Sequence, residues 1–338
     1  MYAYREISTD KTHESFPYFD WLRFVLASAV VLSHAQLIAW AQSGNFAVQI
    51  FFTLSGWLIG GILLQSDRSS LPRFYFNRAT RIWIPYFIAV VILYGLAAVH
   101  EGAGRPFLRC LLSDSTFTHN FFINPLAPMP LGGTGNHFWS ISVEEQFYLA
   151  APLLIVLLPF GRSILLWALL ATAAIVSNFW YGSIALGVLA AVVRRRHGDW
   201  QFTRVGFGAI IVAIVSFGTV MVAVPSSYSW VAPPLAVSII VALSWGGARG
   251  FLGEFFGGMS YPLYLYHWIG LFAARFLQLP ALSGYVLAVI CGAAAYLVID
   301  RNVMRWRASF YHPDNGRALM TVAYSLLAIG LLAGLRMV

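Results

Sequence analysis

The sequence predicts an all-α, polytopic integral membrane protein: a bundle of about 10–11 transmembrane helices with its N-terminus in the cytoplasm. Of the 338 residues, 59% are hydrophobic and only 10% are charged, whereas soluble domains carry roughly 25% charged residues. Long apolar runs recur between polar breaks, and about 20 apolar residues are enough to cross a bilayer. Residues 1–17 are polar and lack the apolar core of a cleavable signal. The first helix is therefore expected to stay in the mature protein.

The apolar runs give about eleven candidate helices. They lie near residues 18–40, 46–65, 81–100, 138–160, 163–180, 182–194, 205–224, 233–248, 257–278, 281–300 and 318–336. The run 182–194 is too short to span a bilayer unaided, so it is either tilted or extended by Arg194. We predict a membrane domain over 16–300, then a cytoplasmic loop and an extra C-terminal transmembrane helix over 301–338. No separate soluble domain is predicted.

The basic residues set the orientation of these helices. The chain carries a net charge of +8, and twenty of its 21 basic residues are arginines. With the N-terminus inside, sixteen basic residues fall in inner segments and three in outer ones: Arg5, Lys11, Arg68, Arg73, Arg78, Arg81, Arg162, Arg194, Arg195, Arg196, Arg204, Arg249, Arg301, Arg305, Arg307 and Arg317 against Arg105, Arg109 and Arg336. This positive-inside pattern favours a multi-pass protein of the cell inner (plasma) membrane, with the C-terminus outside if the helix number is odd.

Other classes of site are disfavoured by composition. Arginines in short loops indicate topology and contacts to phosphate or carboxylate rather than nucleic-acid binding. Cys110 and Cys291 are isolated thiols without metal-ligand or redox spacing, so we predict neither a metal site nor a disulfide.

The first predicted helix carries three ionisable residues, Asp20, Arg23 and His34, in an otherwise apolar run. Ionisable groups at membrane depth are costly and are candidate functional residues. The eleven-residue separation of Arg23 and His34 returns to nearly the same helical face about 16 Å further along. The spacing leaves two interpretations open. Either the face is a functional polar stripe, or Arg23 snorkels and pairs with Asp20 while His34 is an interfacial histidine.

The next two predicted helices carry a packing motif and a pair of arginines. FFTLSGWLIGG, residues 51–61, places Gly56 and Gly60 at the small-xxx-small spacing that lets helices approach closely, and the first helix is the expected partner. FYFNRATRIWIPY, residues 74–86, places Arg78 and Arg81 at i,i+3, so both point the same way. Two guanidiniums suit bidentate capture of phosphate. The alternative is an anchor beside the lipid headgroups.

The longest polar segment, 101–137, is predicted to lie outside and precedes a helix with two adjacent carboxylates. Its end is rich in Pro, Gly and aromatics, which suits a lid or re-entrant cover. In the helix, Glu144 and Glu145 point about 100° apart, so only one can face the bundle interior. We expect Glu144 to meet His34, because a carboxylate beside an imidazole orients a general base. The alternative is an acidic residue favoured by the helix dipole.

His267, between Tyr266 and Trp268 in SYPLYLYHW, is a second candidate site residue. A hydrogen-bonded structural histidine is its alternative interpretation.

Together these segments resemble the acyltransferase 3 family of integral membrane acyltransferases. The similar motifs run in family order over about residues 16–300: Arg23 and His34 with ten residues between them, FFTLSGWLIG, NRATR with Pro85, FWSISVEEQFYL and SYPLYLYHW. The resemblance implies transfer of an acyl group, commonly acetyl from acetyl-CoA, to hydroxyls of extracytoplasmic sugars or related acceptors. It implies that His34 matches the essential histidine of the family. It also implies that Arg23 matches the arginine of the family's Arg-x10-His pattern, and that Arg78 with Arg81 matches its Arg-x-x-Arg pair.

Topology and resemblance together imply a mechanism without a permanently bound cofactor. Acyl-CoA (acetyl-CoA) is the expected donor, held from the cytoplasm by Arg78 and Arg81 with Arg23, and its pantetheine arm is of the same order as the ~16 Å between Arg23 and His34. His34 is expected to act as general base, oriented by Glu144, or as a transient acyl carrier. Further acceptor or thioester contacts are expected among Trp139, Ser142, Glu145 and His267.

The expected partners are a sugar or glycolipid acceptor, membrane lipid and polysaccharide-assembly proteins. Family members often add a periplasmic esterase-like domain, which these 338 residues lack, so a stand-alone membrane module is expected. Two other functions stay open. A transporter or flippase of a lipid-linked saccharide would move its substrate without acyl-CoA. A non-catalytic scaffold in polysaccharide assembly would not depend on His34.

Overall fold

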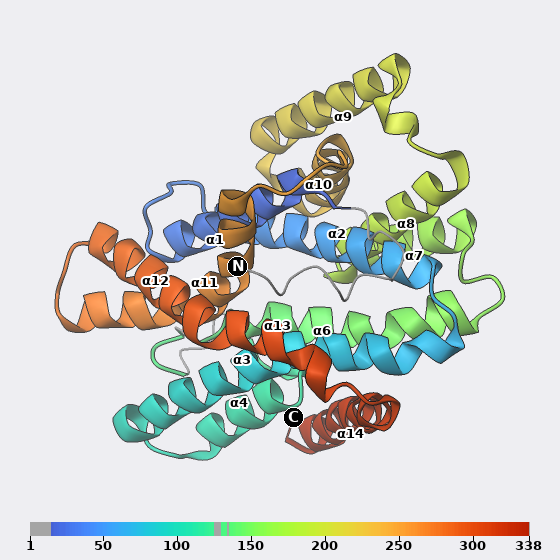
Figure 1. The fold of residues 1–338 in the computed structure, drawn as a ribbon. Helices are drawn as coiled ribbons and strands as arrows, with labels where there is room; N and C mark the ends of the chain where they lie inside the picture. The colour runs from blue at the N-terminus through green and yellow to red at the C-terminus, as the bar shows by residue number, and fades with distance from the viewer. Residues whose placement is uncertain (1–14, 125–129, 134, 338) are drawn as a thin grey trace.

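The protein is a bundle of helices in the computed structural model, which describes residues 15–124, 130–133 and 135–337 (Figure 1). No strand occurs within these ranges. The helices are α1 (Pro17–His34), α2 (Ser43–Leu64), α3 (Leu71–Glu101), α4 (Arg105–Ser115), α5 (His119–Phe122), α6 (Phe138–Pro152), α7 (Ile164–Val176), α8 (Tyr181–His197), α9 (Arg204–Ala223), α10 (Tyr228–Ala242), α11 (Phe251–Phe276), α12 (Ala281–Ala295), α13 (Arg301–Trp306) and α14 (Pro313–Met337). The predicted all-α class is confirmed.

Within the described residues, six helices are long and apolar enough to cross a membrane. They are Ser43–Leu64, Arg68–Glu101, Phe138–Leu157, Arg204–Ala223, Ala281–Phe310 and Pro313–Arg336. The polytopic membrane class is thereby confirmed. The other predicted spans correspond to α1, α7, α8, α10 and α11, which are shorter or less apolar. The sequence thus predicted about eleven spans, whereas six described helices meet the criteria of length and composition for crossing a membrane.

Two helix boundaries near the later site differ from the prediction. α1 ends at His34 rather than near residue 40, because Gln36 takes a left-handed backbone conformation with φ 58° that no α-helix continues. α3 begins at Leu71 rather than 81. Pro72 in its first turn needs no hydrogen-bond partner for its nitrogen, and Asp67 caps the preceding turn by accepting a 3.0 Å hydrogen bond from Ser70 N. Arg78 and Arg81 therefore lie well inside α3.

α2 approaches α8 closely at glycines on both helices. A Cβ atom added at Gly56 would lie 2.1 Å from the carbonyl oxygen of Ile184, and one at Gly187 would lie 2.1 Å from that of Thr53. The packing role predicted for Gly56 is confirmed. Its predicted partner is wrong: these glycines face α8, while α1 contacts α2 elsewhere and packs against α11.

We expect Gly56→Ala to lower the thermal unfolding temperature of the purified protein. The added methyl group overlaps backbone of α8, and overpacking of this kind typically costs about 1–3 kcal/mol. Gly61→Ala is the matched control in the same helix, because nothing lies within 4 Å of its added Cβ. Alanine there should be neutral or stabilising through helix propensity. Equal unfolding temperatures for the two variants would contradict the close contact of α2 with α8.

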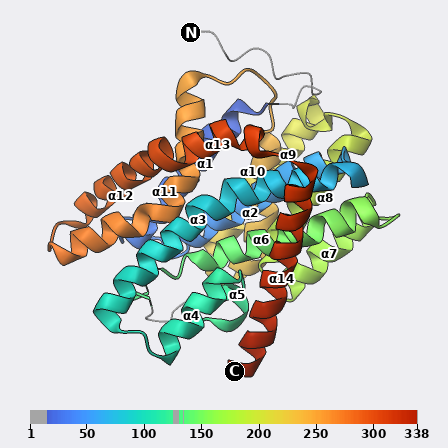
Figure 2. The same cartoon turned by 60° about the horizontal axis from the view of Figure 1, so that its bottom comes forward.

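α14 is part of the bundle, although it lies beyond the predicted membrane domain. It packs along α3 and crosses it obliquely (Figure 2). Tyr324 donates a hydrogen bond of 2.9 Å to the carbonyl of Leu149 and lies 3.0 Å from the hydroxyl of Tyr75. Gly330 makes room for Thr116. The division of the chain at residues 300 and 301 stays a prediction.

The segment 101–137, predicted to lie outside, contains more helix than its composition suggested. α4 and α5 lie within it, and their junction is held by Asp114, which accepts hydrogen bonds from Tyr94 at 2.5 Å and contacts His119 at 2.7 Å. α4 packs on α3 and α14. The Pro- and Gly-rich end predicted to form a cover falls partly on residues 125–129 and 134, outside the described residues.

Candidate active site

A cavity of about 1020 Å³ opens between α1, α2, α3, α6, α8 and α11. Eight arginines line it: Arg23, Arg73, Arg78, Arg81, Arg194, Arg195, Arg249 and Arg307. Only three carboxylates, those of Asp67, Glu144 and Asp199, join them in the lining. Such a surplus of guanidiniums within a helical bundle is suited to an anionic ligand.

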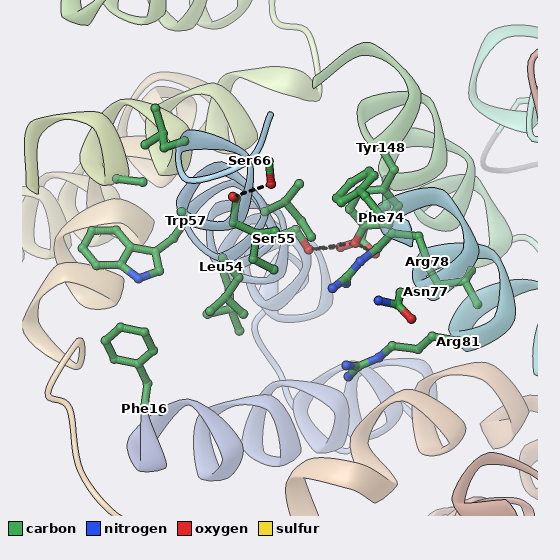
Figure 3. Close-up of a pocket in the computed structure, with 18 of the residues that line it drawn as sticks. Phe16, Leu54, Ser55, Trp57, Ser66, Phe74, Asn77, Arg78, Arg81 and Tyr148 are labelled. Atoms are coloured by element: carbon green, nitrogen blue, oxygen red, sulfur yellow. Dashed lines mark hydrogen bonds between the residues drawn. The ribbon is translucent and has the colours of Figure 1, made fainter. Parts of the chain in front are cut away.

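Arg78 and Arg81 point from one face of α3 into this cavity, as their spacing predicted (Figure 3). The guanidinium of Arg78 lies over the rings of Phe74 and Tyr148, at 5.9 and 6.0 Å from their centroids. Its buried Nε atom has no hydrogen-bond partner among the described residues. In that part of the chain, no carboxylate forms an ion pair with either arginine. Two cations therefore face the same space without a carboxylate in direct contact, although Glu144 lines the same cavity.

Arg23 joins the cavity from α1 while also forming an ion pair. Its Nη1 atom lies 2.9 Å from Asp20 Oδ1, and Arg249 Nε lies 3.0 Å from the other oxygen of the same carboxylate. Asp20 is buried where α1 crosses α11. A Cβ atom added at Gly257 of α11 would lie 2.7 Å from the Cβ atom of Asp20. The Asp20–Arg23 pair belonged to the alternative interpretation of this helix, and it is present. The pair does not remove Arg23 from the site, because both Arg23 and Arg249 line the cavity.

Glu144 also faces the cavity, but its predicted partner was wrong. Its Oε1 accepts a 2.5 Å hydrogen bond from Ser55, and its Oε2 accepts one of 3.2 Å from Tyr148. All three residues line the cavity, and Figure 3 shows Ser55 of α2 turned towards α6. The expected contact with His34 is replaced by this one because α2 packs against both α1 and α6.

His34 instead pairs with His267. His34 is the exposed last residue of α1, and its Nδ1 lies 2.9 Å from Nε2 of His267, which is 1% exposed. His267 Nδ1 lies 2.6 Å from the carbonyl oxygen of Tyr264. Both candidate histidines are thus brought together by the contact of α1 with α11.

The cavity approaches this pair without including His34 in its lining. Tyr264 and Ser140 both line it and are joined by a hydrogen bond of 2.5 Å between their hydroxyls, and the ring of Phe51 lies edge-on to Tyr264 at 6.2 Å. The backbone carbonyl of the same Tyr264 contacts His267. Tyr264 thus lines the cavity and contacts His267, the partner of His34, through its backbone.

Three other predicted contact residues lie in the packed interior and outside the cavity lining. Trp139 packs against Phe52 and Trp180. Among the described residues, the hydroxyl of Ser142 bonds only within its own helix, 3.4 Å from the carbonyl of Phe138. Glu145 accepts a 2.8 Å hydrogen bond from Trp83 Nε1. These three side chains therefore pack in the protein interior and do not face the cavity.

Sequence reasoning missed several residues that line the cavity. Tyr148 lies four residues after Glu144, a spacing that shares one helix face and could have identified it. Arg194 was interpreted as a topological anchor, yet it lies over the rings of Phe16 and Trp57 at the cavity wall and pairs with Asp199 at 2.7 Å. Figure 3 shows Phe16 and Trp57 facing each other there. Only tertiary packing brings these segments together.

The fold and the site define a multi-pass helical membrane protein with an arginine-rich cavity, one of whose lining residues, Tyr264, contacts His267 through its backbone carbonyl. A family model described as an acyltransferase domain matches residues 16–301, and the chain belongs to this acyltransferase 3 family. The resemblance predicted from the motifs is confirmed.

Known proteins with similar sequences carry related names. The chain is 32% identical over 165 residues to a peptidoglycan O-acetyltransferase of Listeria monocytogenes, covering 43% of this chain and 25% of that protein. It is 25% identical over 349 residues to a putative membrane-bound transacylase of Komagataeibacter xylinus, covering 90% and 87%. A putative peptidoglycan O-acetyltransferase of Bacillus subtilis is 28% identical over 158 residues, 43% and 24%. The match thus spans about a quarter of the first and third relatives. No solved structure matches.

Proposed function

We propose that the protein is a membrane O-acyltransferase that takes an acyl group, most simply acetyl, from acyl-CoA and transfers it to a hydroxyl of a sugar or glycolipid. The observation that carries this proposal is a pair of arginines without a carboxylate in ion-pair contact, Arg78 and Arg81, in a cavity whose lining residue Tyr264 contacts His267, the partner of His34. For such a transfer the protein must supply a binding site for the polyanionic donor and a base for the acceptor hydroxyl.

The phosphates of acyl-CoA are the anions for which this cavity is suited. Arg78, Arg81 and Arg23 would bind them through charge-assisted hydrogen bonds, which are the strongest kind available to a guanidinium. The cavity also reaches Ser66, Asp67 and Arg73 between α2 and α3. The positive-inside distribution predicts that this connection is cytoplasmic. The donor would then enter from the side where acyl-CoA is made, with its thioester directed towards Tyr264.

His34 would take the proton of the acceptor hydroxyl. The acceptor oxygen attacks the thioester carbonyl as its proton passes to His34, the carbon–sulfur bond breaks, and the thiolate of CoA takes the proton back. In the alternative sequence, His34 attacks first and carries the acyl group, releasing CoA before the acceptor arrives. Trapping a labelled acyl-enzyme in the absence of acceptor would favour the second sequence. In either route the thioester must reach His34, which does not itself line the cavity.

The acceptor class follows from topology and from the names of the relatives. An exposed His34 at the outer end of α1 suits an extracytoplasmic saccharide, and two relatives are named for O-acetylation of peptidoglycan. We therefore propose a surface polysaccharide or its lipid-linked precursor as acceptor, at the inner membrane, with polysaccharide-assembly proteins as partners.

Turnover of acetyl-CoA by the purified protein in nanodiscs tests the proposal. We expect CoA release that depends on an added saccharide acceptor, with label appearing as an ester on that acceptor. Movement of a lipid-linked saccharide across proteoliposomes without any acyl-CoA requirement would indicate a flippase instead. If both activities are absent and His34→Ala leaves the cellular phenotype intact, the protein is a scaffold.

Glu144→Gln is expected to act on donor affinity rather than on the chemical step. The carboxylate lies in the arginine cavity, bonded to Ser55 and Tyr148 and not to His34. Removing one negative charge there should tighten acyl-CoA binding about fivefold, the effect of roughly 1 kcal/mol between nearby charges. Isothermal titration measures the affinity, and the saturating rate should stay near that of the parent. If Glu144→Gln loses as much of the rate as His34→Ala does, Glu144 takes part in the chemical step and the prediction is wrong.

A further inference from the structure

His267 is held between one backbone oxygen and one imidazole. Its Nδ1 atom lies 2.6 Å from the carbonyl oxygen of Tyr264, one turn earlier in α11, and its Nε2 atom lies 2.9 Å from His34 Nδ1. Its side chain is buried, with 1% of the residue exposed, and the ring of His137 lies 4.6 Å away, centroid to centroid. Every polar atom of this ring thus has a defined partner.

These partners determine where the protons lie. A carbonyl oxygen can only accept, so the 2.6 Å contact requires that Nδ1 of His267 carry a hydrogen. A neutral imidazole has one N–H, so Nε2 of His267 is then an acceptor. The 2.9 Å contact consequently requires His34 to donate from its Nδ1. The Nε2 atom of neutral His34 is left with its lone pair.

The neutral state of His267 follows from its surroundings. A buried imidazolium is costly without a carboxylate partner, and the groups around this pair are other imidazoles and cations. His137 faces His267 across the ring contact, and Arg275 lies two turns further along α11. A second proton on His267 would also direct an N–H at His34 Nδ1. His34 would then have to hold its own hydrogen on Nε2, where a base needs a lone pair.

We propose that His267 is a positioning residue that fixes the tautomer of His34, with Nδ1 protonated and Nε2 free to accept a proton or an acyl group. Its catalytic consequence rests on the proposed function, whereas the tautomer itself does not. His267 takes no proton in the reaction. When His34 becomes an imidazolium, its Nδ1–H remains bonded to His267, and the Nδ1–H of His267 remains bonded to Tyr264.

The same tyrosine connects this device to the donor cavity. The hydroxyl of Tyr264 bonds Ser140 at the end of the cavity, while its backbone carbonyl orients His267. The backbone oxygen belongs to α11 and stays in place when the side chain rotates. Opening of the cavity towards His34 therefore leaves the tautomer of His34 unchanged.

Two amide substitutions separate the tautomer from packing. The amide of His267→Gln can present its oxygen near the former Nε2 position and still accept from His34, whereas the shorter amide of His267→Asn lies near the former Nδ1 position and cannot. In protein labelled with ¹⁵N-histidine, we expect His34 to show a protonated Nδ1 in the parent and in His267→Gln, but not in His267→Asn. The His34 signals are identified by their absence in His34→Gln.

Kinetics supply the second readout. We expect kcat to fall about 100-fold in His267→Asn, within the range that general-base catalysis contributes, and to fall far less in His267→Gln. The dissociation constant for acyl-CoA should be the same in both, because His267 does not line the cavity. Parallel loss of acyl-CoA binding in both variants would indicate a packing role and overturn the proposal.

The spectrum separates this inference from the proposed function. A protonated Nε2 on His34 in the parent, or an unchanged His34 tautomer in His267→Asn, overturns the inference whatever the activity. The expected tautomer in a protein that transfers acyl groups equally well after His34→Ala would refute the proposed role of His34 and leave the inference standing.

Discussion

His34→Ala is expected to abolish acyl transfer while leaving the protein folded and able to bind acyl-CoA. The side chain is exposed at the end of α1, so its removal leaves no cavity in the helix core. It does remove the group that would take the proton of the acceptor hydroxyl. Loss of a general base costs on the order of 10²–10⁴-fold in rate, and a required acyl carrier would cost still more. Transfer of labelled acetyl to a saccharide acceptor measures the effect.

The design needs a control for loss of a histidine in general. His312→Ala serves because the His312 side chain is 66% exposed beside α14 and lies outside the cavity lining. It should keep parental activity. Acyl-CoA affinity and the unfolding temperature of His34→Ala should match those of the parent. Transfer retained at more than a tenth of the parental rate in His34→Ala would remove His34 from the mechanism.

Local patterns in the sequence were sufficient to predict the helices and the direction of their polar faces. The i,i+3 spacing of Arg78 and Arg81 predicted a shared face, and both line the cavity. The adjacent positions of Glu144 and Glu145 predicted that only one would face the bundle interior, and this is wrong: they have different partners, but both carboxylates lie inside the bundle. These statements depend only on the period of one helix.

Contacts between helices were predicted less well, because no single helix determines its neighbours. His34 was assigned to Glu144 on the basis of depth in the membrane alone. The structure pairs it with His267, 233 residues away, since α1 packs on α11 while α2 supplies the contact to α6. The Gly56 surface was assigned to α1 because the connection between the two helices is short, and it faces α8. Depth and connection length restrict the possible partners without selecting among them.

Arg78→Ala and Arg81→Ala are each expected to weaken acyl-CoA binding about 10–100-fold, since a hydrogen bond to a charged group contributes roughly 1.5–3 kcal/mol. Both arginines enter the cavity without a carboxylate partner in the described part of the chain. No internal ion pair competes for them, and none is broken by the substitutions. Their loss should therefore appear in ligand affinity before it appears in stability. Titration of CoA into the protein in nanodiscs measures it.

The remaining variants test whether CoA binding needs the planar guanidinium group or only its positive charge. Arg78→Lys keeps the charge but loses the planar fork, so its affinity should lie between those of Arg78→Ala and the parent. Arg204→Ala, an exposed arginine at the start of α9 outside the cavity lining, should bind CoA as the parent does. Raising the salt concentration should weaken binding to the parent more than to either alanine variant, because fewer charges remain to be screened in the variants. If Arg78→Ala, Arg81→Ala and Arg204→Ala all bind CoA alike, the two arginines of α3 are membrane anchors, and the donor does not bind in this cavity.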